Sequence, residues 1–71
     1  MAQTYHIHGY IDGKVIDRQT EILAVTMKQA SEANNLQLWV GDRVLDYHAL
    51  PLAVMMGNRE PTEEELLKYS F

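Results

Sequence analysis

The fold is decided by residues 5–36, YHIHGYIDGKVIDRQTEILAVTMKQASEANNL. From Tyr5 to Ile11, apolar and polar residues alternate, as they do in a strand that buries one face. Asp12-Gly13 follows, and an Asp-Gly pair between two β-rich runs is a strong hairpin signal, because a type I′ turn needs positive φ at both central residues. The chain is expected to return along a second strand over residues 15–25. This stretch therefore begins with a predicted β-hairpin.

A two-residue loop sets the register of this hairpin and separates its two faces. On one face the expected cross-strand pairs are Tyr10 with Val15, His8 with Asp17, and His6 with Gln19. The expected core residues on the other face are Tyr5, Ile7, Ile11, Ile16, Ile22 and Ala24. Arg18 and Thr20 interrupt that core face, which indicates either a sheet edge or a bulge near Ile22 and Leu23.

A helix is expected directly after the hairpin. Thr26 has the residue type of an N-cap, and Gln29, three residues later, completes a capping box. The helix is predicted from Met27 to about Asn34. Asn34-Asn35 is a suitable stop, because asparagine tolerates the left-handed conformation.

A second hairpin is predicted over residues 36–47, with its turn at Gly41-Asp42. The expected core residues are Leu36, Leu38 and Val40, opposite Tyr47, Leu45 and Arg43. On the other face the expected pairs are Trp39 with Val44 and Gln37 with Asp46.

Two short helices are predicted in the tail. Pro51 suits a first helical position and Gly57 the position after a helix end, so the two frame a helix over residues 52–56. Thr62 then caps a helix over residues 63–69, with Glu65 at the third helical position.

These elements define a single small α+β domain over residues 1–71, of the order ββαββ. We expect one mostly antiparallel four-stranded sheet, a helix on one face and short C-terminal helices. A right-handed crossover is expected to lay the third strand parallel to the first. The topology occurs in many unrelated small domains, some phage-encoded inhibitors among them, so it does not indicate a family.

Composition narrows the class of protein. The chain of 71 residues is 46% apolar, has no cysteine and carries a formal charge of −4. A domain of this size is expected to be stable by roughly 4–10 kcal/mol, so a partner or a homodimer would help it to bury surface. The acidic balance argues against a nucleic-acid partner, because binding to phosphates depends on clustered Lys and Arg. No secretory signal or membrane span is predicted, and a cytoplasmic location is expected.

No motif predicts catalysis or a cofactor. The Glu63, Glu64 and Glu65 run complements the positive end of a helix more simply than it forms a catalytic cluster. His6 and His8 share a strand face and could hold a metal ion with Asp17 and a distant His48, but structural zinc sites need three or four ligands held together. The alternative is a pair of solvent-facing histidines, with His8 hydrogen-bonded to Asp17. We therefore predict neither an enzyme nor a metal site.

The face opposite the first helix carries Tyr10, Val15, Trp39 and Val44 beside the two histidines. An apolar patch with a tryptophan is rarely left open to water. One hypothesis is that residues 50–56 fold across it as a buried helix. The other is that a partner or a second copy docks there, with Trp39 and Tyr10 as anchors.

The function predicted from these observations is a non-enzymatic protein-binding module that occludes or bridges another macromolecule. Its concrete form is a small phage or mobile-element inhibitor or regulator, and an anti-CRISPR-like action belongs to this hypothesis. The predicted contact residues are Tyr10, Trp39, Val44, Asp17, Asp46, Glu63, Glu64 and Glu65. Two alternatives remain: a nucleic-acid-binding module that stacks bases on the aromatic sheet face, and a metal-binding domain that uses His6 and His8.

Overall fold

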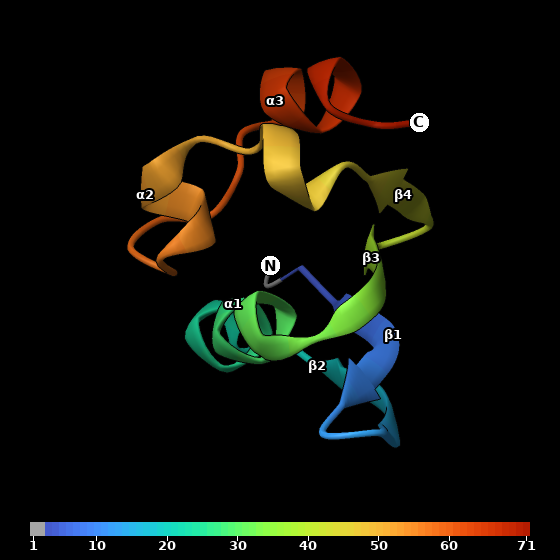
Figure 1. Cartoon of the computed structure of the whole chain (residues 1–71). Helices are drawn as coiled ribbons and strands as arrows, with labels where there is room; N and C mark the ends of the chain where they lie inside the picture. The colour runs from blue at the N-terminus through green and yellow to red at the C-terminus, as the bar shows by residue number, and fades with distance from the viewer. Residues whose placement is uncertain (1–2) are drawn as a thin grey trace.

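The computed structural model describes residues 3–71, and it confirms the predicted α+β fold. A four-stranded antiparallel sheet has the strand order β2-β1-β3-β4. Figure 1 shows α1 and α2 on one side of this sheet and α3 near the β4 end. The elements are β1 (Tyr5–Ile11), β2 (Lys14–Thr20), α1 (Leu23–Glu32), β3 (Asn34–Val40), β4 (Arg43–Leu45), the 3₁₀ turn η1 (Tyr47–Ala49), α2 (Leu52–Met55) and α3 (Glu63–Lys68).

Both hairpins have the predicted registers. In the first, Asp12 and Gly13 adopt positive φ values of 53° and 77°, and Tyr10 lies opposite Val15. In the second, Leu38 pairs with Leu45 and Trp39 with Val44. The second hairpin is shorter than expected, because β4 ends at Leu45 and Tyr47 belongs to η1.

The helix begins earlier than predicted, and the prediction of Thr26 as its N-cap was wrong. β2 ends at Thr20, and α1 starts at Leu23 with Ile22 as its N-cap and no side-chain cap. Thr26 is buried inside the helix, where its hydroxyl donates to the Ile22 carbonyl at 3.0 Å. The β-branched residues of this stretch favour a strand locally, but burial of one helix face overrides that propensity.

The early start of α1 also changes which residues form the core. Leu23, Met27 and Ala30 follow the i, i+4, i+7 spacing of a buried helix face, and all three are buried. Ile22 and Ala24, predicted as core residues of a strand, are instead exposed. The predicted sheet positions Tyr5 and Ile7 are buried as expected, and Ile16 packs at the margin of the core.

The bulge lies in β3 and not at Ile22 and Leu23. α1 ends at Glu32 with Ala33 as its C-cap, so Asn34-Asn35 starts the strand instead of stopping the helix. Asn35 does adopt the left-handed conformation, with φ 54°. The register between β1 and β3 shifts at this point, between the pairs formed by His8 and Tyr10. The extra residue therefore inserts where the chain passes from α1 into the centre of the sheet.

The third strand runs antiparallel to the first, which corrects the predicted parallel arrangement. The crossover through α1 joins β2 to β3, and β1 lies between these two strands. β2 and β3 are each antiparallel to β1, so they are parallel to one another. A crossover links parallel strands, and here those strands are β2 and β3.

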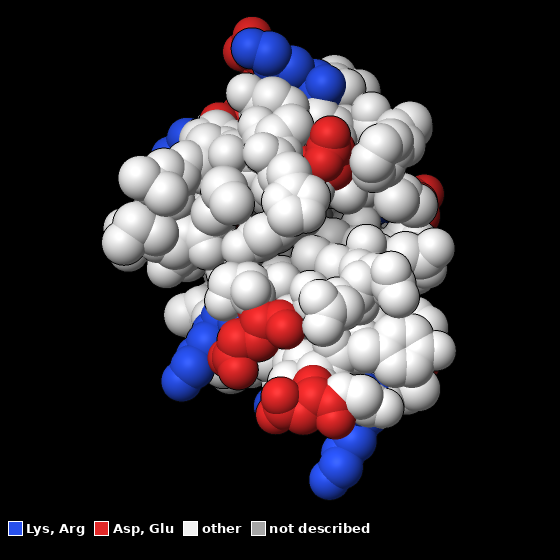
Figure 2. Space-filling view, viewed as in Figure 1, with Lys and Arg blue, Asp and Glu red and all other residues white. Residues whose placement is uncertain are grey.

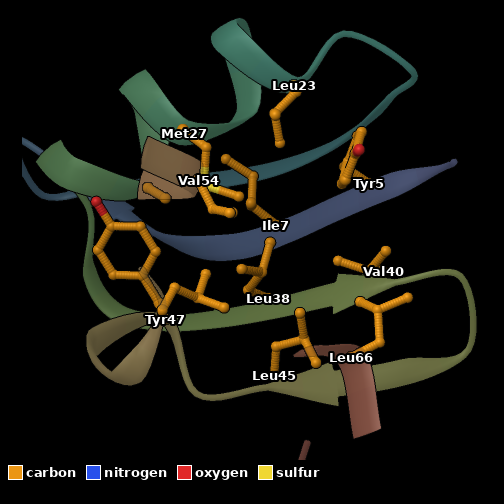
Figure 3. Packing of buried hydrophobic residues seen from close by; sticks show 12 residues of the cluster. Tyr5, Ile7, Leu23, Met27, Leu38, Val40, Leu45, Tyr47, Val54 and Leu66 are labelled. Atoms are coloured by element: carbon orange, nitrogen blue, oxygen red, sulfur yellow. The ribbon is translucent and has the colours of Figure 1, made fainter. Parts of the chain in front are cut away.

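The segment 50–56 packs against the core through Leu50 and Val54 and does not cover the second sheet face. Leu50 and Val54 are buried in the cluster that contains Met27 and Ile7, and Figure 3 shows Val54 beside Met27 above the sheet. α1 is only ten residues long, so this segment completes the layer that α1 begins. The hypothesis that it shields Trp39 was therefore wrong.

The tail helix α3 has the predicted start. Thr62 and Glu65 form a reciprocal capping box, and Leu66 is buried near Leu45 and Val40 in Figure 3. The Arg59 guanidinium donates to both carboxylate oxygens of Glu65, at 2.7 and 2.9 Å. This contact, followed by the backbone N–H of Thr62, lowers the pKa of Glu65 to about 2. No helix within residues 3–71 is long and apolar enough to cross a membrane.

Tyr5 ties the tail to the first strand. Its side chain is fully buried, and its hydroxyl donates to Glu60 Oε1 at 3.1 Å. Burial raises the pKa of the Tyr5 phenol well above its usual value, and the hydrogen bond to Glu60 and the charge of Glu60 raise it further. The neutral phenol is therefore favoured by the folded state.

We expect the pKa of Tyr5 to cause a loss of stability at high pH. Above the unfolded-state pKa of 10.0, the unfolded chain gives up the phenol proton while the folded chain keeps it. The free energy of unfolding then falls as pH rises, by at most about 1.4 kcal/mol per pH unit for one proton. Urea unfolding between pH 8 and 11.5 measures this slope. In Tyr5→Phe the free energy of unfolding should fall less steeply with pH, because the variant lacks this titrating proton. Parallel plots of unfolding free energy against pH for the two proteins would contradict the prediction.

Candidate docking surface

The sheet has an open face, which we call the aromatic face and define as His6, His8, Tyr10, Val15, Asp17, Trp39 and Val44. Strand alternation places these side chains opposite the core. Cross-strand pairing brings the key members together, because Trp39 lies opposite His6 on β1 and opposite Val44 on β4. The predicted grouping of Tyr10, Val15, Trp39 and Val44 on one sheet face follows from these registers.

At the centre of the aromatic face, the His6 and Trp39 rings stack with a centroid separation of 4.8 Å and an interplanar angle of 23°. His6 Nε2 also contacts Asp17 Oδ1. This corrects the predicted bond between His8 and Asp17. Asp17 lies directly opposite His8 and diagonally from His6, and diagonal neighbours are within reach of long side chains. His6 on β1 therefore contacts a residue on each neighbouring strand, Trp39 on β3 and Asp17 on β2.

The helices contribute their buried residues to the opposite side of the sheet. Met27 of α1, Val54 of α2 and Leu66 of α3 all belong to the same core cluster, and Figure 1 shows no helix against the other side of β1 and β3. Tyr10 is 39% exposed and Val15 is 58% exposed. Trp39 and Val44 are partly buried by their neighbours within the sheet. Within residues 3–71 the aromatic face therefore has no cover.

The predicted acidic contact residues are not brought together around this face, with the exception of Asp17. Asp46 caps η1, where its carboxylate accepts from the backbone N–H of His48 at 3.2 Å. Glu63 pairs with Arg43 at 3.4 Å, and Glu65 pairs with Arg59. Glu64 is an exposed residue in the first turn of α3. Asp46, Glu63 and Glu65 therefore have local partners, whereas Glu64 has none among residues 3–71.

The histidines do not converge. Strand alternation places His6 and His8 on the aromatic face as predicted, whereas His48 follows β4 and packs edge-on against Tyr47, whose side chain belongs to the core. No group of three or more His, Cys, Asp or Glu side chains within residues 3–71 is close enough to hold a metal ion.

A groove of about 420 Å³, which the sequence did not indicate, opens on the helix side of the sheet. Ala30, Asn34 and Leu36 line one wall, and Tyr47 and His48 line another. Phe71 at the C-terminus borders it and is 86% exposed. The lining comes from residues 30–36, residues 45–48 and Phe71, and it includes the titratable side chains of Asp46, Tyr47 and His48.

Positive charge is not concentrated near the aromatic residues. Lys14 and Arg18 alternate with Val15 and Asp17 along β2, so their side chains are directed to the other side of the sheet. On the face shown in Figure 2, the Lys and Arg side chains lie apart from one another toward the edges of the molecule. A stacking surface for nucleic acid normally lies in a basic groove. The aromatic face has Asp17 instead.

Comparison with protein-family models, with curated proteins and with solved structures finds no match to this chain. Function must therefore be inferred from the surface itself, because an α+β fold of this size hosts many unrelated activities.

Proposed function

We propose that this protein is a non-enzymatic protein-binding module and that the aromatic face is its docking surface. The observation that supports this best is that the exposed Tyr10 and the half-buried Trp39 lie on the sheet face opposite the one that all three helices cover. Tryptophan and tyrosine are the side chains most enriched at the energetic centres of protein interfaces. The stacked His6 ring holds Trp39 in a defined orientation, which reduces the entropy lost on binding.

The concrete form of this proposal is an inhibitor or regulator of phage or mobile-element type that covers a working surface of a host macromolecular machine. A small domain with a charge of −4 is suited to occlusion of another protein, because its acidic balance disfavours binding to phosphates. An anti-CRISPR-like action is one case of this mode.

We expect Trp39→Ala to weaken association with the partner while the fold is retained. Truncation of an aromatic anchor at a desolvated interface commonly costs about 2 kcal/mol or more, or roughly thirtyfold in affinity. Trp39 is not part of the buried cluster, so the circular dichroism spectrum should keep its shape. Capture from a bacterial lysate, with mass spectrometry of the proteins retained, compares the wild type with the variant.

The matched control is Leu67→Ala. Leu67 is 61% exposed on α3, away from the aromatic face, and its truncation should leave the retained proteins unchanged. Equal retention by wild type and Trp39→Ala would exclude the aromatic face as the docking surface. Conversion of a dimer to a monomer by Trp39→Ala, seen by sedimentation, would identify the partner as a second copy.

A further inference from the structure

The two edge strands of the sheet differ in whether another segment of the chain pairs with them. The outer side of β4 is closed by the C-terminal residues: Leu45 bridges Ser70, Phe71 N–H donates to Val44 O, and Asp46 N–H donates to Tyr69 O, the last two at 2.9 Å. β2 forms the other edge and pairs only with β1 among residues 3–71. The protein therefore covers its short edge strand and leaves its seven-residue edge strand open.

The backbone direction of β2 identifies the groups that face outward. In an antiparallel ladder, alternate residues direct both main-chain groups to the same neighbour. The Thr4 carbonyl accepts from Gly41 N–H at 2.8 Å, so the even-numbered residues of β1 point toward β3 and its odd-numbered residues toward β2. Their partners on β2 are the even-numbered residues. The N–H and C=O groups of Val15, Asp17 and Gln19 are therefore directed away from the sheet.

The side chains along this edge carry a simple charge pattern. Lys14, Ile16 and Arg18 alternate on the helix side of the sheet, with the apolar residue between two basic ones. Lys14 and Arg18 are exposed, and neither forms an ion pair within residues 3–71. Charged residues on an edge strand discourage indiscriminate pairing. The same charges favour an incoming strand of opposite charge, because facing charge pairs stabilise a ladder and like pairs destabilise it.

A second copy of this chain does not fit the pattern. Antiparallel pairing of two β2 strands about a twofold axis, with at least five residues of each strand paired, must be centred on Ile16, Asp17 or Arg18. Centring on Ile16 places Lys14 opposite Arg18 at both ends. Centring on Asp17 or on Arg18 places that residue opposite its own copy. Each of these registers places like charges directly opposite each other, which destabilises the pairing.

We propose that β2 binds an extended segment of a partner protein as a fifth strand, and that it selects segments with the pattern acidic–x–apolar–x–acidic. The acidic residues would face Lys14 and Arg18, and the apolar residue would face Ile16. This inference rests on the proposed protein-binding function and names a second contact, which uses backbone hydrogen bonds for affinity and side-chain charge for selection. The pattern is symmetric, so it suits either strand direction.

The test uses a fluorescein-labelled probe, Thr-Thr-Glu-Lys-Val-Val-Glu, designed to run antiparallel to β2 from Thr20 to Lys14. The matched control exchanges its charges, Thr-Thr-Lys-Glu-Val-Val-Lys, and keeps length and β-propensity. Fluorescence anisotropy at low salt should show the acidic probe binding roughly tenfold more tightly than the control, because all three facing charge pairs, those with Lys14, Asp17 and Arg18, change sign. The double variant Lys14→Glu with Arg18→Glu should reverse this preference. Equal binding of both probes, or no binding, would overturn the proposal.

Two further measurements distinguish strand addition from simple charge attraction. N-methylation of the probe residue that faces Asp17 should abolish binding, whereas N-methylation of the residue that faces Ile16 should be tolerated, because only the former N–H points toward β2. Bound probe should also slow amide hydrogen exchange at Val15, Asp17 and Gln19. Strand addition would be contradicted if both N-methylated probes bound equally well, or if bound probe left exchange at these three amides unchanged. If these amides were protected without any probe and sedimentation showed a dimer, a second copy of the chain would occupy the β2 edge. That result would exclude the proposed selection of acidic partner segments.

The outcome is separable from that of the aromatic face. Trp39 lies on β3, two strands away from the open edge, so Trp39→Ala should bind the acidic probe as the wild type does. Loss of lysate partners in Trp39→Ala with intact probe binding supports both surfaces. Retention of those partners with intact probe binding removes the aromatic face and leaves the edge. Loss of probe binding in Trp39→Ala would contradict an independent edge site.

Discussion

We expect Val54→Asp to unfold the protein and Leu52→Asp, two residues earlier in the same helix, to leave it folded. Val54 is fully buried in the core, whereas Leu52 is 69% exposed. A carboxylate at position 54 would have no charged or hydrogen-bonding partner in a cluster of apolar side chains. An unpaired buried charge costs roughly 3–5 kcal/mol, which is comparable to the roughly 4–10 kcal/mol expected for the stability of the whole domain.

Circular dichroism and thermal unfolding at pH 7 measure the difference between these variants. The milder Val54→Ala should lower the free energy of unfolding by about 1–2 kcal/mol, because it removes two buried methyl groups. These results would establish that α2 belongs to the core and leaves the aromatic face open. A folded Val54→Asp that has lost its ability to associate would instead place α2 in an interface.

The second large effect is expected at Gly57, where α2 approaches α1. Gly57 has a φ of 77°, and a Cβ there would lie 2.8 Å from Ala24 Cα and 3.3 Å from Ala24 Cβ. Gly57→Ala should therefore incur about 1–2 kcal/mol for the left-handed conformation and a further roughly 1–3 kcal/mol for overpacking against a backbone atom that cannot move alone. The expected total is about 2–5 kcal/mol.

Gly41→Ala is the control that separates the two contributions. Gly41 also has a positive φ, 63°, but a Cβ there meets nothing within 4 Å. Its replacement should incur only the conformational cost, so Gly41→Ala should unfold at a higher urea concentration than Gly57→Ala. Equal midpoints for the two variants would show that α1 and α2 do not approach each other as closely as Ala24 and Gly57 do in this structure.

The covered helix side and the open aromatic face together explain how a chain this short can fold and still present apolar surface. Within residues 3–71, twelve hydrophobic residues form the buried cluster, drawn from β1, β3, β4, η1, the three helices and Leu50, and Ile16 of β2 packs against it. Because Leu50 and Val54 are needed to complete that cluster, they are not available to shield Trp39. The sheet is therefore buried on one side only, which is common for antiparallel sheets.

Features that depend on neighbouring residues could be predicted from the sequence. Asp12-Gly13 and Gly41-Asp42 specify tight turns, and a two-residue loop leaves a hairpin with one register. The pairs of Tyr10 with Val15 and of Trp39 with Val44 were predicted correctly for this reason. The predicted pair of Gln37 with Asp46 is not formed, because β4 ends at Leu45. The capping box of Thr62 and Glu65 was predicted because its two hydrogen bonds join residues three apart.

Features that depend on packing could not be predicted in this way. Residues 22–25 suit a strand by propensity, and only the burial of Leu23 against the sheet shows that they belong to a helix. The apolar segment 50–56 suits either side of the sheet, and its side was decided by the space that α1 leaves over β1 and β3. Asp17 contacts His6 and not the directly opposite His8, and the His6 ring also stacks on Trp39, a residue 33 positions later in the chain.

The sequence by itself determined the two hairpin turns, the capping box of α3 and the faces of the paired strand residues, because turn geometry and strand alternation act over a few residues. The tertiary structure alone decided where α1 begins, which face the tail covers, and which edge of the sheet stays open. These choices compare the burial of whole segments against one another. The segment around Val54 could cover either side of the sheet, and the residues on both sides, such as Ile7 and Trp39, are distant from it in sequence. An open aromatic face and an open β2 edge are the result of these choices.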